Sequence, residues 1–490
     1  MIVIGAYPDS ITIAGKSSLR ALGDFLTQIV PSEAALHVLP FYPSSGDFGF
    51  APDNWFEVRA DLGDWSDIEW LSSTRRVIVD GVYNHVGGNH HFVRRFFAAP
   101  SEDTVLYAFP AARAVRGPSF PRGVPVLRRY ALGNGEWDLW QTFSENSFDI
   151  RLDISDVRDE IKRHLRFLAE RGAWGVRLDG CAYYGKVPGQ EQFHHPLAKV
   201  YARAIAGLAA EARLQVVAQL DCDPEGCAYF PRNLGYRIPV VDYAYSALLV
   251  QAILGEDIQP LAAHLRQTWT LPCPVIRPPR THDGILLQSD LLSSASFDAI
   301  VSIAKERSLP IRSANGDYYE LNSSLPYICS MGVDAPKMWS RLRMVIALTG
   351  FLPDWSYFYL PMLVGDIPEL RECEYDDPRG MNRMPIGAAV RDAPDSKEMM
   401  ATRALLMRLS LLKERAANTQ RRLEDEVSVR CESALRIEWR AAAAQLVCNF
   451  STTRALSISR VLTHEVIYSE RSSVCEVEPL GFIICQSRSA

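Results

Sequence analysis

Short runs of β-branched and apolar residues recur along the chain, and each is bounded by polar or turn-forming residues. Bounded apolar runs of this length are typical of strands buried on both faces, as in a parallel sheet. The runs are Ile2–Ala6, Ala35–Leu39, Arg76–Val79, Trp174–Leu178, Leu214–Ala218 and Pro274–Ile276.

Helical patterns lie between these runs. The clearest, Asp156–Arg171, has an apolar face made of Val157, Ile161, Leu165 and Leu168. We expect Ser155 to be its N-cap and Gly172 to end it. Strands that alternate with helices over about 350 residues predict a parallel α/β fold, and a (β/α)₈ TIM barrel fits that length.

The alternation is interrupted twice and changes near the end of the chain. Residues 86–143 are too long for a simple loop and predict an inserted subdomain, and residues 283–335 predict a second one. The barrel is then expected in residues 1–85, 144–282 and 336–400. Within residues 401–490 a closing helix gives way to a period-two pattern at Leu435, Ile437 and Trp439, which indicates a small antiparallel β domain.

Composition narrows the choice of partners and compartment. Lys and Arg number 52 against 58 Asp and Glu, for a net charge of −6, which argues against nucleic-acid or membrane-surface binding. The start of the chain lacks the pattern of a signal peptide, and no apolar stretch is long enough to span a bilayer. The ten cysteines are scattered without zinc-finger spacing, so we expect reduced thiols, a cytoplasmic protein and no metal.

Polar residues that end the apolar runs are the candidates for chemistry, because a barrel carries its active site at the carboxyl ends of its strands. Singly, each has a plain structural explanation: a helix cap, an ion pair or a buried histidine. Together they favour a polar pocket suited to a sugar. They are Asp47, Asp80 with Asn84-His85, Arg177 with Asp179, Gln219 and Thr281-His282-Asp283.

At these positions the sequence resembles the sucrose phosphorylase-like branch of the α-amylase superfamily (glycoside hydrolase family 13). The strings that carry the resemblance include HVLPFYPSSGDFGFAP at His37–Pro52, VDGVYNH at Val79–His85, LWQTFS at Leu139–Ser144, GVRLDGCAY at Gly175–Tyr183, THDG at Thr281–Gly284 and MNR at Met381–Arg383. No nucleotide or flavin motif is visible, so no cofactor is expected.

The resemblance implies a role for each matched residue. Asp179 corresponds to the nucleophile that forms a covalent glucosyl-enzyme, and Arg177 to the residue that orients it. Asp283 corresponds to the carboxylate that stabilises the oxocarbenium-like transition state, with His282 and His85 as hydrogen-bond partners of the sugar.

The same resemblance implies a closed, glucose-sized pocket and an acceptor side. Asp47 and Arg383 correspond to the pair that grips the far end of a terminal glucose, and Phe50 and Phe143 to the aromatic walls. Tyr183 corresponds to an aromatic residue at the leaving-group site. The remaining candidates lie in acceptor or phosphate loops: Arg122, Asp317, Tyr319 and Glu320.

One residue departs from the family pattern. Retaining glycosidases use a second carboxyl group as acid/base, and the family places it at the end of the strand after the nucleophile's strand. Here Gln219 stands in that position. An amide cannot transfer the proton, so the substitution favours acidic leaving groups and anionic acceptors.

Three interpretations stay open. The first is a retaining α-glucosyl transferase or phosphorylase that uses a donor such as sucrose or α-glucose 1-phosphate. The second is an ordinary sucrose-type phosphorylase or hydrolase in which Glu320 or Asp221 supplies the proton. The third is a catalytically silent sugar-binding protein. The expected partners are a small-molecule sugar donor and acceptor, and the sequence leaves open a homodimer.

Overall fold

The computed structural model describes residues 1–113, 125–230, 237–268, 271–288, 291–314, 317–370, 378–417, 427–431, 434–439, 443–457, 464–472 and 476–487. Its contacts divide the chain into two compact units. The first unit comprises Met1–Ala6, Asp24–Ala35 and Asp242–Ala490, and the second comprises Tyr7–Gly23 and Leu36–Val241.

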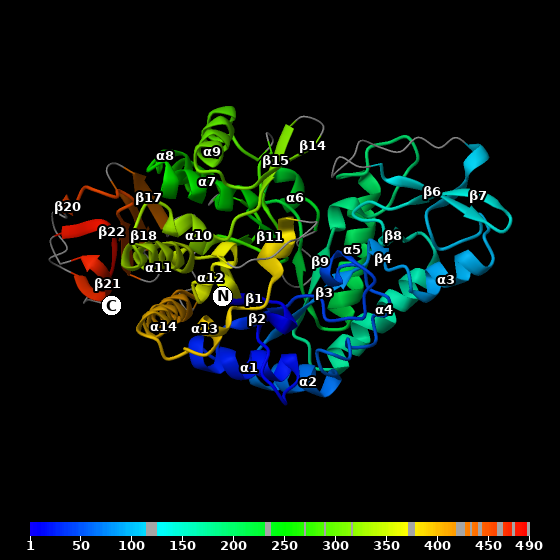
Figure 1. Ribbon diagram of the computed structural model, residues 1–490, viewed down its shortest axis with the longest axis horizontal. Coiled ribbons are helices and arrows are strands. Elements are labelled where there is room, and N and C mark those ends of the chain that lie inside the picture. Colours follow the sequence, from blue (N-terminus) through cyan, green and yellow to red (C-terminus); the bar gives the residue numbers. More distant parts are fainter. Residues whose placement is uncertain are drawn as a thin grey trace. The chain divides into compact units, whose positions relative to one another are not determined.

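Eight strands form one sheet in the order β10, β9, β3, β2, β1, β16, β12, β11 (Figure 1). Their bounds are β1 Ile2–Ala6, β2 Ala35–Val38, β3 Val77–Val82, β9 Gly175–Asp179, β10 Gln215–Ala218, β11 Val240–Val241, β12 Val275–Arg277 and β16 Trp355–Tyr359. The β1–β16, β2–β3, β3–β9, β9–β10 and β12–β16 pairs are all parallel. Strands such as β1 and β9 are buried along their whole length, as their largely apolar runs predict. The predicted parallel α/β barrel class is confirmed.

Helices alternate with these strands. Those before β11 are α1 Ser18–Ile29, α2 Trp65–Thr74, α3 His91–Ala98, α4 Ser155–Glu170, α5 Pro196–Glu211 and α6 Pro224–Cys227. Those after it are α7 Tyr243–Leu254, α8 Gln259–Thr268, α9 Ser294–Glu306, α10 Leu325–Ser330, α11 Ala335–Phe351, α12 Leu360–Leu363, α13 Ala388–Arg391 and α14 Lys397–Ala417.

Helix α4 shows where local prediction succeeds and fails. Its apolar face is buried at Val157, Ile161, Leu165 and Leu168, as predicted. The expected N-cap is wrong: Ser155 is the first helical residue, and its hydroxyl points to the Asp156 carboxylate instead of a backbone N–H. Gly172 follows the helix with φ of +82°, a left-handed conformation that glycine adopts without strain.

The first predicted insertion, residues 86–143, holds α3 and a three-stranded antiparallel sheet. The sheet is built from β5 Ala108–Pro110, β6 Leu127–Leu132 and β7 Gly135–Trp140, while β4 His85–Val86 pairs with β8 Phe148–Asp149. It has its own apolar cluster of Tyr107, Phe109, Val126 and Trp140. The second, residues 283–335, holds α9, α10 and a sheet of β13 Ile285–Leu286, β15 Asp317–Leu321 and β14 Ile311–Ala314.

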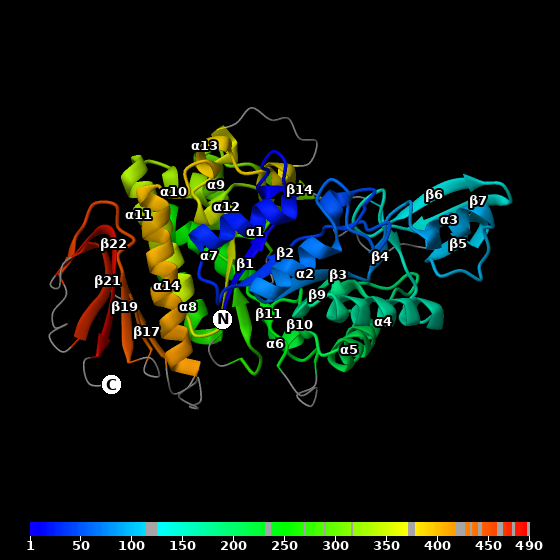
Figure 2. The same ribbon diagram turned by 90° about the horizontal axis from the view of Figure 1, so that it is seen from below.

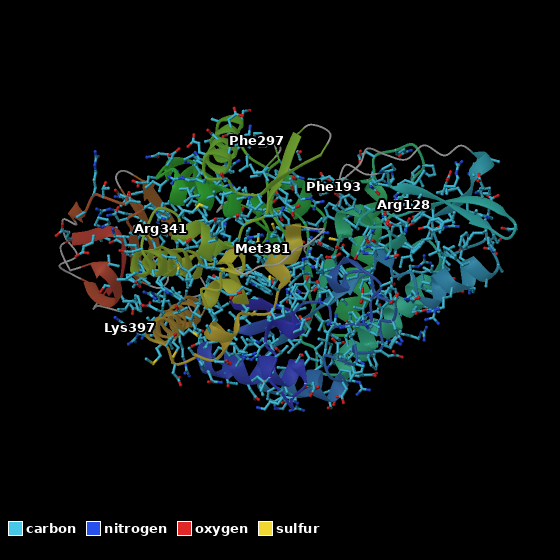
Figure 3. The ribbon with its side chains drawn as sticks, in the orientation of Figure 1. Arg128, Phe193, Phe297, Arg341, Met381 and Lys397 are labelled. Atoms are coloured by element: carbon cyan, nitrogen blue, oxygen red, sulfur yellow. The ribbon has the colours of Figure 1, made fainter. Side chains whose placement is uncertain are left out.

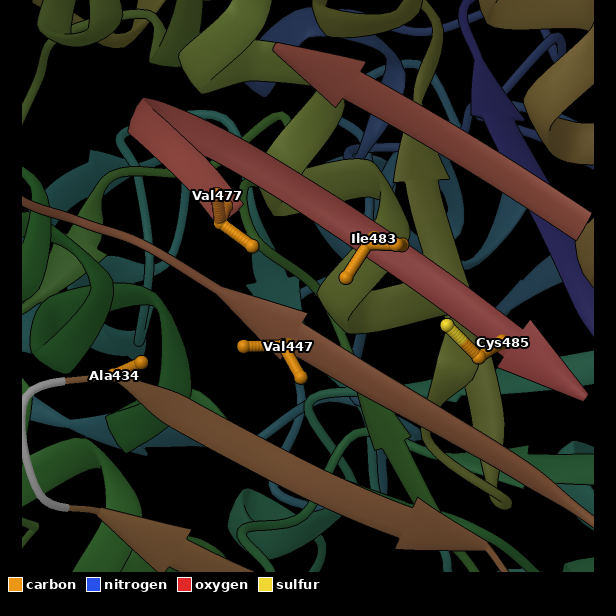
Figure 4. Packing of buried hydrophobic residues seen from close by; sticks show 5 residues of the cluster. All are labelled: Ala434, Val447, Val477, Ile483 and Cys485. Carbon is orange, nitrogen blue, oxygen red and sulfur yellow. The ribbon is translucent and has the colours of Figure 1, made fainter. Parts of the chain in front are cut away.

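The C-terminal part forms an antiparallel sheet beside α14 (Figure 2). Its strands are β17 Val427–Cys431, β18 Leu435–Trp439, β19 Ala444–Cys448, β20 Leu456–Ser457, β21 His464–Ser472 and β22 Glu476–Ser487. Burial alternates along β18 as the period-two pattern predicts. Figure 4 shows part of its core, where Ala434, Val447, Val477, Ile483 and Cys485 pack together.

The cysteines follow the sequence expectation only in part. Cys181, Cys222, Cys329, Cys448 and Cys485 are buried free thiols. Cys227 and Cys273 are disulfide-bonded, which corrects the expectation of reduced thiols at those two positions. Among the residues that the structure describes, no helix has the length and apolar character needed to cross a membrane.

Candidate active site

The candidate nucleophile lies at the carboxyl end of β9. Asp179 is 7% exposed and accepts a hydrogen bond from Arg177 Nη1 at 2.9 Å. The same nitrogen donates to Asp80 on the neighbouring strand β3, where Asp80 stands directly opposite Arg177 in the parallel register. The register of two strands therefore fixes the guanidinium, and the guanidinium orients Asp179.

Asp80 is fully buried and carries a second partner, the ring of His37 on β2. The His37 Nε2 atom lies 3.0 Å from Asp80 Oδ2. Burial alone would raise the pKa of Asp80, but the charges and hydrogen bonds of His37 and Arg177 outweigh it and lower the pKa to about 2. Asp80 is thus an anchor carboxylate that is ionised at neutral pH.

Gln219 follows β10, the strand beside β9. Leu178 on β9 pairs with Ala218 on β10. Asp179 and Gln219, the residues that follow this pair, therefore stand at matching positions on the two strands. The Gln219 Oε1 atom accepts the N–H of Gly180, the residue after the candidate nucleophile, at 2.8 Å. Because the carbonyl oxygen is engaged, the amide nitrogen is left as the donor end of this side chain.

His85 and the two aromatic walls lie in the same unit. His85 Nε2 donates to the Phe50 carbonyl at 2.6 Å, and its Nδ1 lies 3.3 Å from Asn84 Nδ2, so a sugar hydroxyl would have to replace one of these partners. Burial lowers the pKa of His85, which keeps the ring neutral. The rings of His85 and Phe143 are 5.2 Å apart, and those of Phe143 and Tyr183 are 5.1 Å apart.

Asp47 is held in an uncommon backbone conformation. It begins a short 3₁₀ turn, Asp47–Gly49, with φ of +47°, and Phe48 follows with φ of +52°. Left-handed conformations are costly for residues with a side chain and cluster at functional sites. This observation adds to the motif match at Asp47.

The first unit contains the second cluster of candidates. Arg383 Nη2 donates to Asp283 Oδ1 at 2.7 Å, and its Nε donates to the His282 carbonyl at 3.4 Å. His282 Nε2 lies 3.4 Å from the other Asp283 oxygen. The Arg383 side chain is 2% exposed, whereas Asp283 is 30% exposed, so the carboxylate is presented to a ligand by a buried guanidinium.

Glu320 is a fully partnered carboxylate. Its Oε1 accepts the N–H of Gly284 at 2.8 Å, and its Oε2 lies 3.5 Å from Arg312 Nη1. For Asp317 and Tyr319 the structure describes the backbone within β15, and their side chains lie outside the described part. Arg122 also lies outside the described residues, so its proposed phosphate contact stays a prediction.

Sequence reasoning missed two residues that build the second unit's site. His37 is the first residue of the string His37–Pro52, but the sequence predicted no function for it. Lys186 is buried, and its ammonium group lies 2.9 Å from Asp149 Oδ2 and donates to the side chain of Asn84 and to the carbonyl of Tyr183. It therefore ties the His85 neighbourhood to the acceptor-side Tyr183. The only signal for Lys186 was its place seven residues after Asp179.

Among the described residues of the second unit, one group of side chains could hold a metal ion by its geometry. Atoms of His90, His91 and Glu160 lie within 4.8 Å of one another. His90 Nδ1 accepts the Phe92 N–H as a helix cap, which puts the ring proton on Nε2 and removes the lone pair that a metal would need there. Glu160 already has side-chain partners in Arg163 and His91. The group therefore fits a capped helix with surface ion pairs better than a metal centre.

Comparisons with known proteins show what this chain is similar to. The family model for the α-amylase catalytic domain matches residues 32–205. The glucosylglycerate phosphorylase of Spirochaeta thermophila is 26% identical over 314 residues, which cover 62% of this chain and 53% of that protein. The sucrose phosphorylase of Streptococcus mutans is 23% identical over 386 residues, which cover 73% and 76%. The chain spans about half the length of the first of these relatives.

Solved structures show the same fold. Sucrose 6F-phosphate phosphorylase from Thermoanaerobacter thermosaccharolyticum superposes with a TM-score of 0.74 at 19% identity, covering 91% of this chain and 92% of that one. Isomaltulose synthase from Erwinia rhapontici gives 0.74 at 13% identity, covering 99% and 98%. Fold and matches together show a TIM-barrel protein that is similar to the α-amylase catalytic domain over residues 32–205. The predicted resemblance to the sucrose phosphorylase-like branch is confirmed.

Proposed function

We propose that this protein is a retaining α-glucosyl transferase or phosphorylase whose preferred donors carry an acidic leaving group, such as α-glucose 1-phosphate. The observation that carries the proposal is the amide of Gln219 beside Asp179, where the family has a carboxylic acid. The phosphorylases among the relatives support the glucosyl-transfer chemistry.

The reaction would proceed by two displacements at the anomeric carbon. A carboxylate oxygen of Asp179 attacks C1 while the bond from C1 to the leaving oxygen breaks, and the acceptor oxygen then attacks C1 and releases Asp179. A departing sugar alkoxide needs a proton, and supplying it is worth about 10²–10⁴-fold. Phosphate leaves as a stable anion because its second pKa is only about 6. An incoming phosphate or carboxylate likewise needs no base.

The geometry of Gln219 supports a role as a hydrogen-bond donor without proton transfer. With Oε1 bound to the Gly180 N–H, the amide nitrogen can donate to the oxygen of a bound leaving group. The donor has no titrating proton. It therefore suits a leaving group that is already anionic.

The alternative proton donors gain no support. Both carboxylate oxygens of Glu320 already have partners, the Gly284 N–H and the Arg312 guanidinium, so neither is free to donate to a leaving group. Asp221 lies past the end of β10 and pairs through its backbone with Val241. A silent sugar-binding protein would gain nothing from the buried Asp80–Arg177–Asp179 arrangement, because such charges are costly to bury.

A donor and acceptor screen with two variants tests the proposal. Wild type should turn over α-glucose 1-phosphate faster than sucrose, with phosphate or carboxylate acceptors. Gln219→Glu should raise sucrose cleavage by about 10²-fold and introduce a bell-shaped pH profile, while α-glucose 1-phosphate turnover changes far less. Gln219→Leu, which keeps the bulk but removes the donor, should slow both donors. Fast sucrose cleavage by wild type, unchanged in Gln219→Glu, would refute the proposal.

A further inference from the structure

Helix α14 exposes a ridge of apolar side chains to solvent on the face opposite its buried residues. Its buried residues include Leu405, Leu406, Leu409 and Leu412, and Leu409 packs closely over Gly350 of α11. On the opposite side Met400, Met407 and Leu411 are 54%, 49% and 49% exposed, and Ala404 between them is exposed as well. In Figure 2 no other ribbon lies in front of α14.

The spacing of this ridge is that of a coiled-coil seam. Lys397, Met400, Ala404, Met407, Leu411 and Glu414 follow one another at alternating steps of three and four residues, all of them exposed. This is the a/d pattern by which two helices pack side by side. The seam is about 25 Å long at 1.5 Å per residue.

The two ends of the seam carry opposite charges. Lys397, labelled in Figure 3, begins the helix, and Glu414 lies in its last turn. Within the residues that the structure describes, neither makes an ion pair. Each is therefore available to a partner.

An antiparallel second copy of α14 matches this pattern at every layer. A twofold axis between Ala404 and Met407 places the small Ala404 against the large Met407 of the other copy. The next layers out pair Met400 with Leu411. The outermost layers then pair Lys397 with Glu414, twice by symmetry. A parallel second copy would instead set like charges together at both ends.

We propose that the protein forms a twofold homodimer through an antiparallel pair of α14 helices with this register. One short helix pair buries less than the ~1,200 Å² of a standard interface, so the dimer should be reversible with a Kd of roughly micromolar order. The inference is independent of the proposed catalytic function.

Sedimentation of the full chain from ~1 to ~200 μM, a range that brackets such a Kd, tests the interface. Wild type should shift from monomer to dimer. Met407→Glu, which puts a charge in the central layer, should stay monomeric throughout. Val200→Glu is the matched control, because Val200 on α5 is 55% exposed but outside the seam, and it should dimerise as wild type does.

Charge exchange tests the register. Lys397→Glu alone should weaken the dimer about tenfold, since it replaces two attractive pairs by repulsive ones. The double variant Lys397→Glu/Glu414→Lys should return to within about threefold of wild type. A wild type that stays monomeric, or a dimer that persists in Met407→Glu, overturns the interface. A double variant no tighter than Lys397→Glu overturns the antiparallel register. Unchanged thermal melting shows that each variant is folded.

Discussion

A single guanidinium nitrogen connects the candidate nucleophile to the buried framework. Arg177 donates from Nη1 to Asp80 on one strand and to Asp179 on its own strand. The Asp80 carboxylate therefore determines where Arg177 lies, and Arg177 determines where the carboxylate of Asp179 points. Removing the carboxylate of Asp179 and removing that of Asp80 should therefore have different consequences.

Asp179→Asn should abolish glucosyl transfer from every donor, because no covalent intermediate can form without the carboxylate. The measurement is turnover of sucrose and of α-glucose 1-phosphate, together with mass spectrometry of wild type treated with a slow fluoro-sugar donor. The label is expected on Asp179. A label on another carboxylate, or activity retained in Asp179→Asn, would refute this role.

Asp80→Asn should destabilise the protein by about 3–5 kcal/mol at neutral pH, since it removes the buried carboxylate that Arg177 and His37 share. Folding lowers the pKa of Asp80 to about 2 from an ordinary value near 3.9, so its stabilisation is complete above pH ~4 and is lost as pH falls toward 2. The gap in urea midpoint between wild type and variant should therefore narrow between pH 4 and pH 3.

Asp61→Asn is the matched control for that experiment. Asp61 also pairs with an arginine, Arg59, but its side chain is 65% exposed. Exposed pairs contribute at most about 1 kcal/mol, so this variant should change the urea midpoint little. A loss of stability as large as that of Asp80→Asn would show that burial of an ion pair does not determine how much it stabilises the fold.

The residues at strand ends could be predicted from the sequence because each of them directly follows a run of buried residues. Asp179 and Gln219 directly follow largely apolar runs, and the structure places both at strand ends. His37 and Lys186 could not be assigned in this way. Their partners, Asp80 and Asp149, are 43 and 37 residues away in sequence, and only the fold brings them together.

At the scale of elements, strands with long apolar runs were predicted and atypical strands were missed. The six predicted runs match β1, β2, β3, β9, β10 and β12 to within three residues at either end, and β1 matches at both ends. Strand β11 has only two residues, too few to show a pattern, and β16 is Trp355–Tyr359, an aromatic stretch directly after a buried helix. Both strands are defined by their pairing with neighbouring strands of the sheet, which a local sequence pattern does not encode.

The turn after β9 is an element on which the site depends. Gly180 has φ of +56°, and its N–H is the partner of Gln219 Oε1. Gly180→Ala should cost about 1–2 kcal/mol of stability through the left-handed backbone. An added Cβ would lie 3.4 Å from the Phe143 ring, in ordinary contact, so strain and not collision is the cause.

Activity separates the role of this turn from general strain. Gly189→Ala is the control, because Gly189 has φ of +80° and open space around it. Both variants should lose similar stability by urea denaturation, but only Gly180→Ala should lower kcat, by at least about tenfold, because it shifts Gln219 and the start of the Asp179 turn. Equal kcat values would show that the Gly180–Gln219 contact is unimportant.

Candidate residues lie in each of the two units of the molecule. The resemblance implies that Asp47, in the second unit, and Arg383, in the first, act on the same end of a terminal glucose. Arg383 is buried on Asp283, so Arg383→Ala leaves that carboxylate without its guanidinium. We expect Asp47→Ala and Arg383→Ala each to lower kcat/KM for α-glucose 1-phosphate by at least about 10²-fold.

A double-mutant cycle with long donors decides whether these two residues serve one pocket. If Asp47 and Arg383 bind the same glucose, the double variant should lose much less than the product of the single losses, because the second substitution removes contacts already broken. Wild type should leave maltoheptaose uncleaved, since a pocket closed beyond the terminal glucose leaves no room for a longer chain. Additive losses would place the two residues in separate roles. Efficient cleavage of maltoheptaose would mean that the pocket is open at that end, and that the resemblance at Asp47 and Arg383 does not extend to their function.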